Sequence, residues 1–100
     1  AENCDPSWFG FLITVKDGDR NKVTKYIEDH NIQTRLLFSG NLTRHPCFDQ
    51  IRGTDAYRVV GDLTGTEEVL TKTFWVGVYP GMTDEMIDFM AKTIKEALEQ

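Results

Sequence analysis

The sequence is poor in the residues that mark several classes of protein. Its 100 residues contain two cysteines and three prolines, too few for a disulfide framework or a proline-rich disordered chain. No apolar run approaches the roughly 20 residues that a membrane-spanning helix needs. Positive charge is also scarce, because 11 Lys and Arg face 16 Asp and Glu, for a net charge of −5. This balance argues against nucleic acid or an anionic membrane as the main partner.

What is present is the composition of an ordinary globular protein, with 40% hydrophobic and 27% charged residues. One hundred residues make one small domain with a modest core. The polar and acidic opening, Ala1–Pro6, is not a secretion signal, so we expect a cytoplasmic protein with Cys4 and Cys47 reduced. The chain does not begin with Met, and we expect it to be a piece of a longer protein.

Three hydrophobic runs rich in β-branched and aromatic residues predict strands at Ser7–Lys16, Ile32–Phe38 and Phe74–Val78. The first run is apolar on both faces, which predicts a central strand that is covered on both sides. Gly10 lies inside this run and indicates the close approach of another backbone.

Two longer helices are predicted from capping residues and apolar spacing. Asn21 is expected to cap a helix that ends near His30, and Asn31 suits the left-handed position after it. The apolar stripe of this helix consists of Val23, Tyr26 and Ile27. Thr83 is expected to cap the final helix. Its buried stripe is predicted to be Met86, Ile87, Met90, Ile94, Ala97 and Leu98.

The middle of the chain has weaker signals. Pro46–Ile51 predicts a short helix with proline in its first turn. Tyr57–Val60 suits either a short strand or an extended loop. Thr64–Glu67 has the spacing of a capping box, which predicts a short helix through about Lys72.

This order of elements predicts an α/β (α+β) two-layer sandwich, with about three or four strands and with helices on one face. The strands are hydrophobic on both sides, so the opposite face of the sheet should be partly apolar. In a domain of this size, we expect such a face to be buried against something outside the chain.

The stretch Thr34–Pro46 is the strongest candidate for ligand binding, because it starts as a strand and breaks into a polar loop. The turn Ser39–Asn41 tolerates positive φ and is expected to present free backbone N–H groups. With Arg35 and Arg44 on either side, it suits a ligand rich in hydroxyl and phosphate oxygens. An ordinary strand exit with solvated arginines is the alternative. Arg35 differs, because an arginine within an apolar strand needs a partner or a ligand.

Other chemistry finds less support in the sequence. The cysteines and histidines show neither CxxC nor HxxxH spacing, so we expect no metal site and no catalytic nucleophile in this chain. No glycine-rich phosphate motif occurs. Further candidates for ligand contact, with core, turn or surface packing as the alternative, are Trp8, Phe9, Arg58 and Tyr79.

Four strings of the sequence resemble the C-terminal part of the CDP-4-keto-6-deoxyglucose 3-dehydrases, which belong to the sugar aminotransferase superfamily. They are Asp5–Phe11, Ile32–Pro46, Gly53–Val59 and Thr73–Thr83, and together they run over nearly the whole chain. The Arg-Leu-Leu-Phe-Ser-Gly-Asn string is fairly specific, because ordinary sugar aminotransferases typically have a His-Tyr-Pro motif in place of Leu-Phe-Ser-Gly.

The resemblance implies the small C-terminal domain of a type I aminotransferase fold, with a large cofactor-binding domain outside residues 1–100. It implies an enzyme, inactive as this portion alone, that uses pyridoxamine or pyridoxal phosphate and a 2Fe–2S cluster. The enzyme removes the C3 hydroxyl of a CDP-4-keto-6-deoxy sugar on the way to the 3,6-dideoxyhexoses of lipopolysaccharide. A flavin and iron–sulfur reductase is the implied electron donor, and the full-length enzyme is an implied homodimer.

The resemblance also implies that this domain covers the active site, with no catalytic base or cluster ligand of its own. The residues expected on the substrate side are Phe9, Arg35, Ser39, Gly40, Asn41 and Arg58. The alternatives are the small domain of a nucleotide-sugar aminotransferase and a stand-alone module that binds a protein through its uncovered apolar face.

Overall fold

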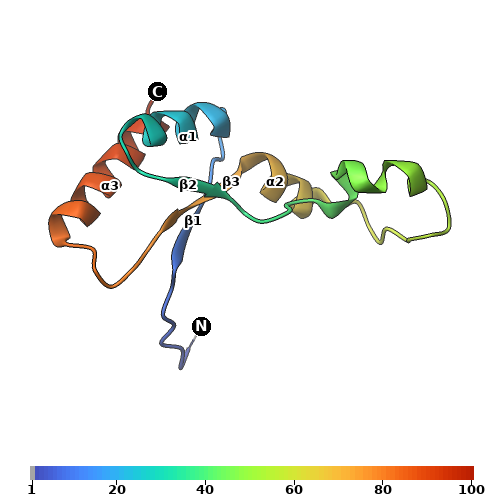
Figure 1. Cartoon of the computed structure of the whole chain (residues 1–100), viewed down its shortest axis with the longest axis horizontal. Helices are drawn as coiled ribbons and strands as arrows, with labels where there is room; N and C mark the ends of the chain where they lie inside the picture. The colour runs from blue at the N-terminus through green and yellow to red at the C-terminus, as the bar shows by residue number, and fades with distance from the viewer. Residues whose placement is uncertain (1) are drawn as a thin grey trace.

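The structure is a computed structural model that describes residues 2–100 (Figure 1). Its elements are, in order, β1 (Gly10–Thr14), α1 (Arg20–Asp29), β2 (Thr34–Leu36), the 3-10 helices η1 (Leu42–Arg44) and η2 (Pro46–Ile51), α2 (Thr64–Lys72), β3 (Thr73–Gly77) and α3 (Asp84–Leu98). None of the helices in the described part is long and apolar enough to cross a lipid bilayer.

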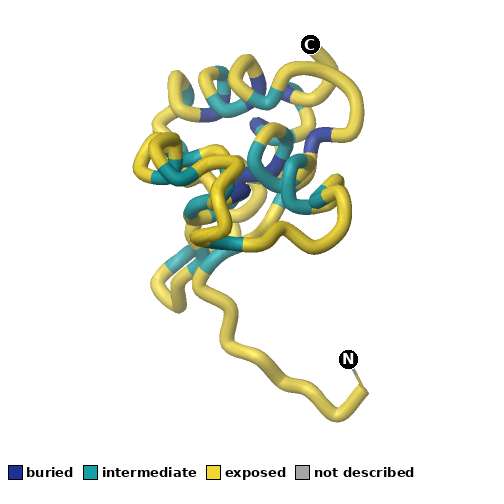
Figure 2. Tube along the Cα trace, turned by 90° about the vertical axis from the view of Figure 1, so that its right-hand side faces the viewer, coloured by how far each residue is buried: buried dark blue, intermediate teal, exposed yellow. Residues whose placement is uncertain are grey.

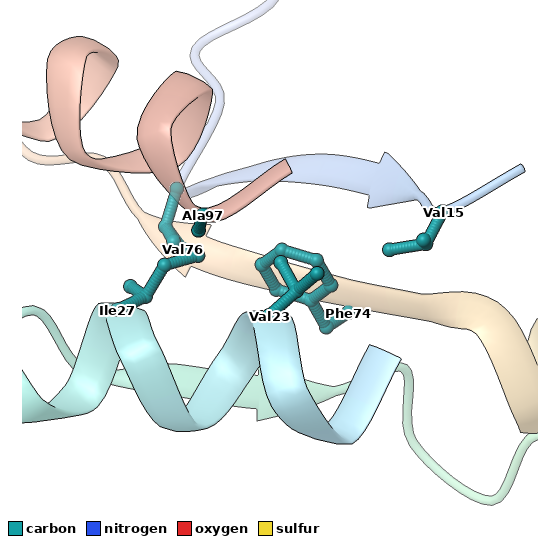
Figure 3. Close-up of a cluster of buried hydrophobic side chains, with 6 residues drawn as sticks. All are labelled: Val15, Val23, Ile27, Phe74, Val76 and Ala97. Atoms are coloured by element: carbon teal, nitrogen blue, oxygen red, sulfur yellow. The ribbon is translucent and has the colours of Figure 1, made fainter. Parts of the chain in front are cut away.

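The sheet has three antiparallel strands in the order β1-β3-β2, so β3 is the central strand. The pairing places Phe74 and Val76 of β3 on one face and Trp75 on the other. α1 and α3 lie on the face of Phe74 and Val76 (Figures 1 and 3). This confirms the predicted two-layer α+β arrangement with helices on one face.

The core is small and lies between β3 and the two helices. Phe74 and Ile27 are fully buried at its centre. The other members of the cluster, labelled in Figure 3, are Val15, Val23, Val76 and Ala97. Figure 2 shows how few positions of the chain are deeply buried, as expected for a domain of this length.

The prediction that the first strand is central and covered on both sides is wrong. β1 is an edge strand, and Phe11 and Leu12 keep 62% and 54% of their surface exposed. The neighbour of Gly10 is the ring of Trp75 and not a backbone, since a Cβ at Gly10 would lie 2.0 Å from Trp75 Cε3. β3 takes the centre because it pairs with both other strands.

α1 follows the predicted helix closely except at its cap. The capping side chain is Asp19, whose carboxylate accepts from Asn21 N at 2.8 Å, and not that of Asn21. The helix ends as expected, with Asn31 at φ +60°. Asn31 N and Ile32 N donate back to carbonyls of the last turn at 3.0 and 3.2 Å, the pattern of a Schellman motif.

α2 ends at Lys72 as predicted, but the expected capping box is wrong. Leu63 occupies the N-cap with φ +55° and no capping side chain. The carboxylate of Asp62 accepts from Thr64 N at 3.1 Å, which lowers the pKa of Asp62. Glu67, the residue expected to close the box, is bonded to a distant loop instead.

α3 begins as expected, with the Thr83 hydroxyl accepting from Met86 N at 3.3 Å. Its predicted buried stripe is only partly correct. Ala97 is buried, and Met90 and Ile94 pack against the core. The remaining members, Met86, Ile87 and Leu98, are 43–46% exposed. The core contacts of α3 come from Met90, Ile94 and Ala97, which leaves Met86 and Ile87 at its start and Leu98 at its end partly uncovered.

β2 is shorter than the predicted strand Ile32–Phe38. Phe38 adopts φ +46°, and its amide turns back to Leu36 O at 2.8 Å, which ends the strand. The polar loop that follows contains the unpredicted η1, whereas η2 has the predicted bounds. Tyr57–Val60 forms no strand and has no regular secondary structure.

From the described core, we expect substitution of a buried aromatic residue to lower stability much more than substitution of an exposed one. Phe74→Ala should lower the free energy of unfolding by about 3–5 kcal/mol, because it leaves a cavity at the centre of the cluster. Phe38→Ala is the matched control, since Phe38 is 79% exposed and should change stability by less than about 0.5 kcal/mol. Urea unfolding followed by circular dichroism measures both, and equal effects would contradict the described core.

Candidate functional site

The indole ring of Trp75 spans the uncovered face of the sheet. Its Nε1 donates to the carbonyl oxygen of Leu36 on β2 at 3.2 Å. At the other end, its six-membered ring occupies the space that a side chain at Gly10 on β1 would fill. The ring is therefore fixed at both ends, and the absence of a side chain at Gly10 makes this position possible.

Phe9 packs edge-on against Trp75, with the ring centroids 5.1 Å apart and the planes at 88°. The backbone before β1 is held in place, because Val78 N donates to Phe9 O at 2.9 Å. Trp8 and Phe9 are nevertheless 70% and 66% exposed, so they are not core residues. The face of the sheet opposite the helices thus carries exposed aromatic rings, as the hydrophobic strands predict.

Arg35 lies directly opposite Trp75 in the pairing of β2 with β3. Its Nη1 donates to Thr34 O at 3.1 Å. None of the ion pairs found in residues 2–100 includes Arg35. The guanidinium therefore has no carboxylate partner within the described residues. Arg35 is exposed, however, so the expectation that it lies within a buried apolar strand and must have a partner or a ligand is wrong.

Arg35, Trp75 and Phe9 line one side of a groove of about 620 Å³. The other walls come from the segment His30–Gln33 at the end of α1 and from methionines at the start of α3. Among residues 2–100, no aspartate or glutamate lines this groove, although the chain carries a net charge of −5. An apolar groove with a guanidinium at its edge suits a small molecule that carries an anionic group.

The approach to Arg35 is held by bonds that involve the end of α1. The left-handed turn at Asn31 directs the chain toward β2. Thr34 is buried, and its hydroxyl donates to Glu28 Oε1 at 2.5 Å. These contacts position the backbone from which Arg35 projects.

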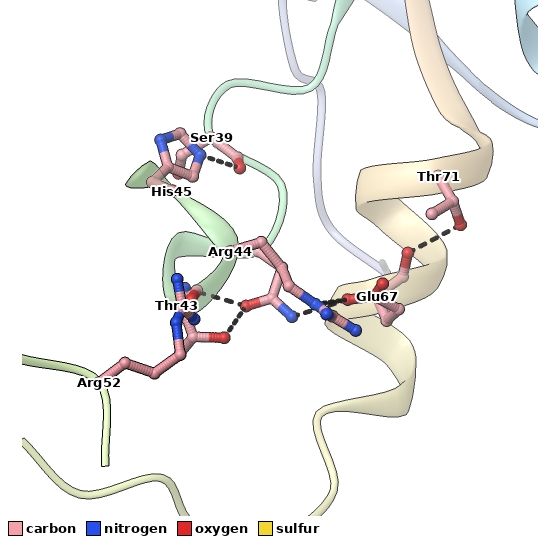
Figure 4. A network of polar contacts seen from close by, with 8 residues as sticks. Ser39, Thr43, Arg44, His45, Arg52, Glu67 and Thr71 are labelled. Carbon is pink, nitrogen blue, oxygen red and sulfur yellow. Dashed lines mark hydrogen bonds and ion pairs between the residues drawn. The ribbon is translucent and has the colours of Figure 1, made fainter. Parts of the chain in front are cut away.

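The polar loop after β2 is tied to α2 by one carboxylate (Figure 4). Glu67 Oε2 accepts from Asn41 Nδ2 at 2.9 Å and from Arg44 Nε at 3.2 Å. The Asn41 side chain oxygen accepts from Thr43 N and Thr43 Oγ1 at 3.1 and 2.7 Å. Asn41 is buried and lines a separate hollow of about 330 Å³, and its side chain is bonded within the chain.

The turn before Asn41 has the predicted left-handed backbone, with Gly40 at φ +57°. A Cβ at Gly40 would lie 2.8 Å from Leu70 Cα, so the loop also approaches α2 closely here. The expectation of free backbone amides is wrong at Gly40, because its N–H donates to Leu37 O at 3.0 Å. The Ser39 carbonyl bonds His45 Nε2 at 2.7 Å.

The predicted substrate-side residues thus fall into three places. Phe9 and Arg35 share the groove beside Trp75. The loop Ser39–Asn41 lies beyond Phe38, toward α2. Arg58 is exposed in the irregular segment after η2, outside the linings of both hollows.

Two residues gain a role that the sequence patterns did not reveal. Trp75 was one aromatic among many in a predicted strand, and only its pairing with Leu12 and Arg35 brings it over Gly10. The one hint in the sequence was the glycine inside the first strand, which indicates that another group packs closely against it. Glu67 fitted a local capping pattern, and no pattern in the sequence indicated its bonds with Asn41 and Arg44.

Cys4 and Cys47 are exposed and free. Within residues 2–100, no three His, Cys, Asp or Glu side chains are grouped to hold a metal ion. The described residues therefore do not fit an iron–sulfur cluster.

The fold and the groove define a small α+β domain with an uncovered aromatic face. The sequence profile of the DegT/DnrJ/EryC1/StrS aminotransferase family matches residues 1–95, so the chain belongs to this family. This confirms the sugar aminotransferase superfamily that the sequence motifs indicate.

Two curated relatives are similar to nearly the whole chain. A protein of Saccharopolyspora spinosa named dTDP-4-dehydro-2,6-dideoxy-D-glucose 3-dehydratase is 50% identical over 95 residues, covering 92% of this chain and 20% of its own length. Lipopolysaccharide biosynthesis protein RfbH of Salmonella typhimurium is 45% identical over 99 residues, covering 96% of this chain and 22% of its own. The chain therefore spans about a fifth of the length of these relatives.

The contacts of Glu67 predict a dependence of stability on pH. The hydrogen bond from Asn41, and then that from Arg44, lower the pKa of Glu67 from its ordinary 4.5. The stabilisation is therefore complete above pH 4.5 and is lost as the pH falls through the lower pKa of the folded state.

We expect Glu67→Gln to be less stable than the natural chain at pH 7, with a difference that shrinks as the pH falls toward 3. Urea unfolding at a series of pH values measures this difference. Glu68→Gln is the matched control on the same helix, because Glu68 is exposed and makes none of these bonds. If the difference in free energy of unfolding between the natural chain and Glu67→Gln did not change with pH, the stabilising role of the ionised Glu67 carboxylate would be contradicted.

Proposed function

We propose that this chain is the C-terminal small domain of a nucleotide-sugar 3-dehydrase whose large cofactor-binding domain lies outside residues 1–100. The observation that carries the proposal is the groove in which Arg35, without a carboxylate partner in the described residues, adjoins Trp75 and Phe9. The family match and the printed name of the 3-dehydratase relative support it.

We further propose that the reaction is the removal of the C3 hydroxyl of CDP-4-keto-6-deoxyglucose, which makes the complete enzyme a lyase. Its product would supply 3,6-dideoxyhexoses of the lipopolysaccharide O-antigen. The name of the Salmonella typhimurium relative, a lipopolysaccharide biosynthesis protein, supports this role. The name of the Saccharopolyspora spinosa relative favours a second candidate, a dTDP-linked sugar as the substrate.

The proposed enzyme uses pyridoxamine or pyridoxal phosphate together with a 2Fe–2S cluster. The described residues offer no ligand set for the cluster, so we assign both cofactors to the proposed large domain. We also propose a flavin and iron–sulfur reductase as electron donor, a homodimeric enzyme and a cytoplasmic location. This portion alone is expected to be inactive.

Within this proposal, the small domain binds and orients the substrate. Arg35 donates hydrogen bonds to oxygens of the nucleotide sugar, and Phe9 contributes an apolar contact in the same groove. The loop residues Ser39, Gly40 and Asn41 and the exposed Arg58 are proposed to contact the substrate where the two domains meet. Their part in the site remains a prediction.

Arg35→Ala in the full-length enzyme tests the proposal. We expect kcat/KM to fall about ten- to two-hundredfold, because a charge-assisted hydrogen bond contributes about 1.5–3 kcal/mol. Arg35→Lys keeps the charge and loses the planar pair of donors, so it should restore only part of the loss. Steady-state kinetics with the nucleotide sugar gives the result, and unchanged kinetics in Arg35→Ala would remove this residue from the site.

A further inference from the structure

Trp75 is half-buried, and part of its side chain lines the groove that contains Arg35. The ring is held by the Leu36 carbonyl at one end and lies over Gly10 at the other, so it loses little freedom when a ligand binds. Phe9 meets it edge-on and narrows the groove. A fixed aromatic surface at the edge of a groove suits a flat ring that stacks on it.

The charge in the groove favours an anion beside that flat ring. Arg35 and Trp75 are directly opposite each other in the sheet, which places their Cβ atoms about 4.5–5.5 Å apart. The guanidinium donates one bond, to Thr34 O, and its other N–H groups are available for bidentate contact with a phosphate. The described part of the chain places no carboxylate side chain in the lining that would repel an anion.

The size and the remaining walls fit the same ligand. A volume of about 620 Å³ lies within the usual range of small-molecule sites. Met82, before α3, and Met86 and Met90 within it form one wall, and their side chains adapt to different shapes. The amide side chains of Asn31 and Gln33 add hydrogen-bonding groups near the end of α1.

We infer that this groove binds the nucleotide half of the substrate, with the base stacked on Trp75 and a phosphate on Arg35. The inference rests on the proposed function, and it adds which half of the nucleotide sugar this domain holds. Since stacking tolerates different bases, the groove should accept CDP and dTDP with comparable affinity.

The test is calorimetric titration of the complete enzyme with CDP and with dTDP, without turnover. Trp75→Leu should weaken binding of both on the order of ten- to a hundredfold, and Trp75→Phe should restore much of it, because it keeps an aromatic ring. Arg35→Gln should weaken binding of both about ten- to a hundredfold, with Arg35→Lys in between.

Leu12→Ala is the matched control, because Leu12 pairs with Trp75 on the same face and lies outside the groove. It should bind CDP within about twofold of the natural enzyme, as expected for a residue without ligand contact. Thermal unfolding of each variant shows that it is folded.

Two results would overturn the inference. If Trp75→Leu lowers the melting temperature but binds CDP normally, the ring is covered by another part of the protein or by a second copy. If Arg35→Gln weakens CDP binding and Trp75→Leu does not, the base lies elsewhere. Turnover of the nucleotide sugar by the natural enzyme is a separate measurement, so a failure of the proposed function is distinguished from a failure of this inference.

Discussion

The arrangement of this domain depends on the contact between the Trp75 ring and Gly10. Any side chain at position 10 would collide with the ring, so this strand can pair with β3 beside Trp75 only because it carries a glycine there. The bond to the Leu36 carbonyl connects the same ring to β2. One side chain thus links all three strands on the face that no helix covers. The opposite face forms the core with α1 and α3, which leaves the exposed rings and Arg35 together on one side.

A second constraint holds the loop after β2 away from that face. Glu67 bonds Asn41 and Arg44, and Gly40 approaches Leu70, so the loop follows α2 (Figure 4). Arg20, at the start of α1, donates to Leu70 O at 2.6 Å and fixes the other end of α2. The groove and the loop are therefore positioned by separate sets of contacts. The two sets meet at the Leu36 carbonyl, which accepts from both Trp75 Nε1 and Phe38 N.

The sequence predicted the local features of this fold better than the long-range ones. The stripe of α1, the turn at Asn31 and the Thr83 cap depend on neighbouring residues, and the structure confirms them. The central strand was assigned wrongly because β1 and β3 are similarly hydrophobic, and only pairing decides which lies in the middle. Arg35 was singled out as an arginine within an apolar strand, but Arg35 and Leu36 are exposed in β2. The position of Arg35 opposite Trp75 arises from the strand register, which no local pattern encodes.

The most direct measurement is a crystal structure of the complete enzyme with CDP bound. We predict that the base lies parallel to the Trp75 ring and that a phosphate oxygen lies about 2.7–2.9 Å from the Arg35 guanidinium. A structure in which protein covers the Trp75 ring and CDP binds away from this groove would contradict the central claim.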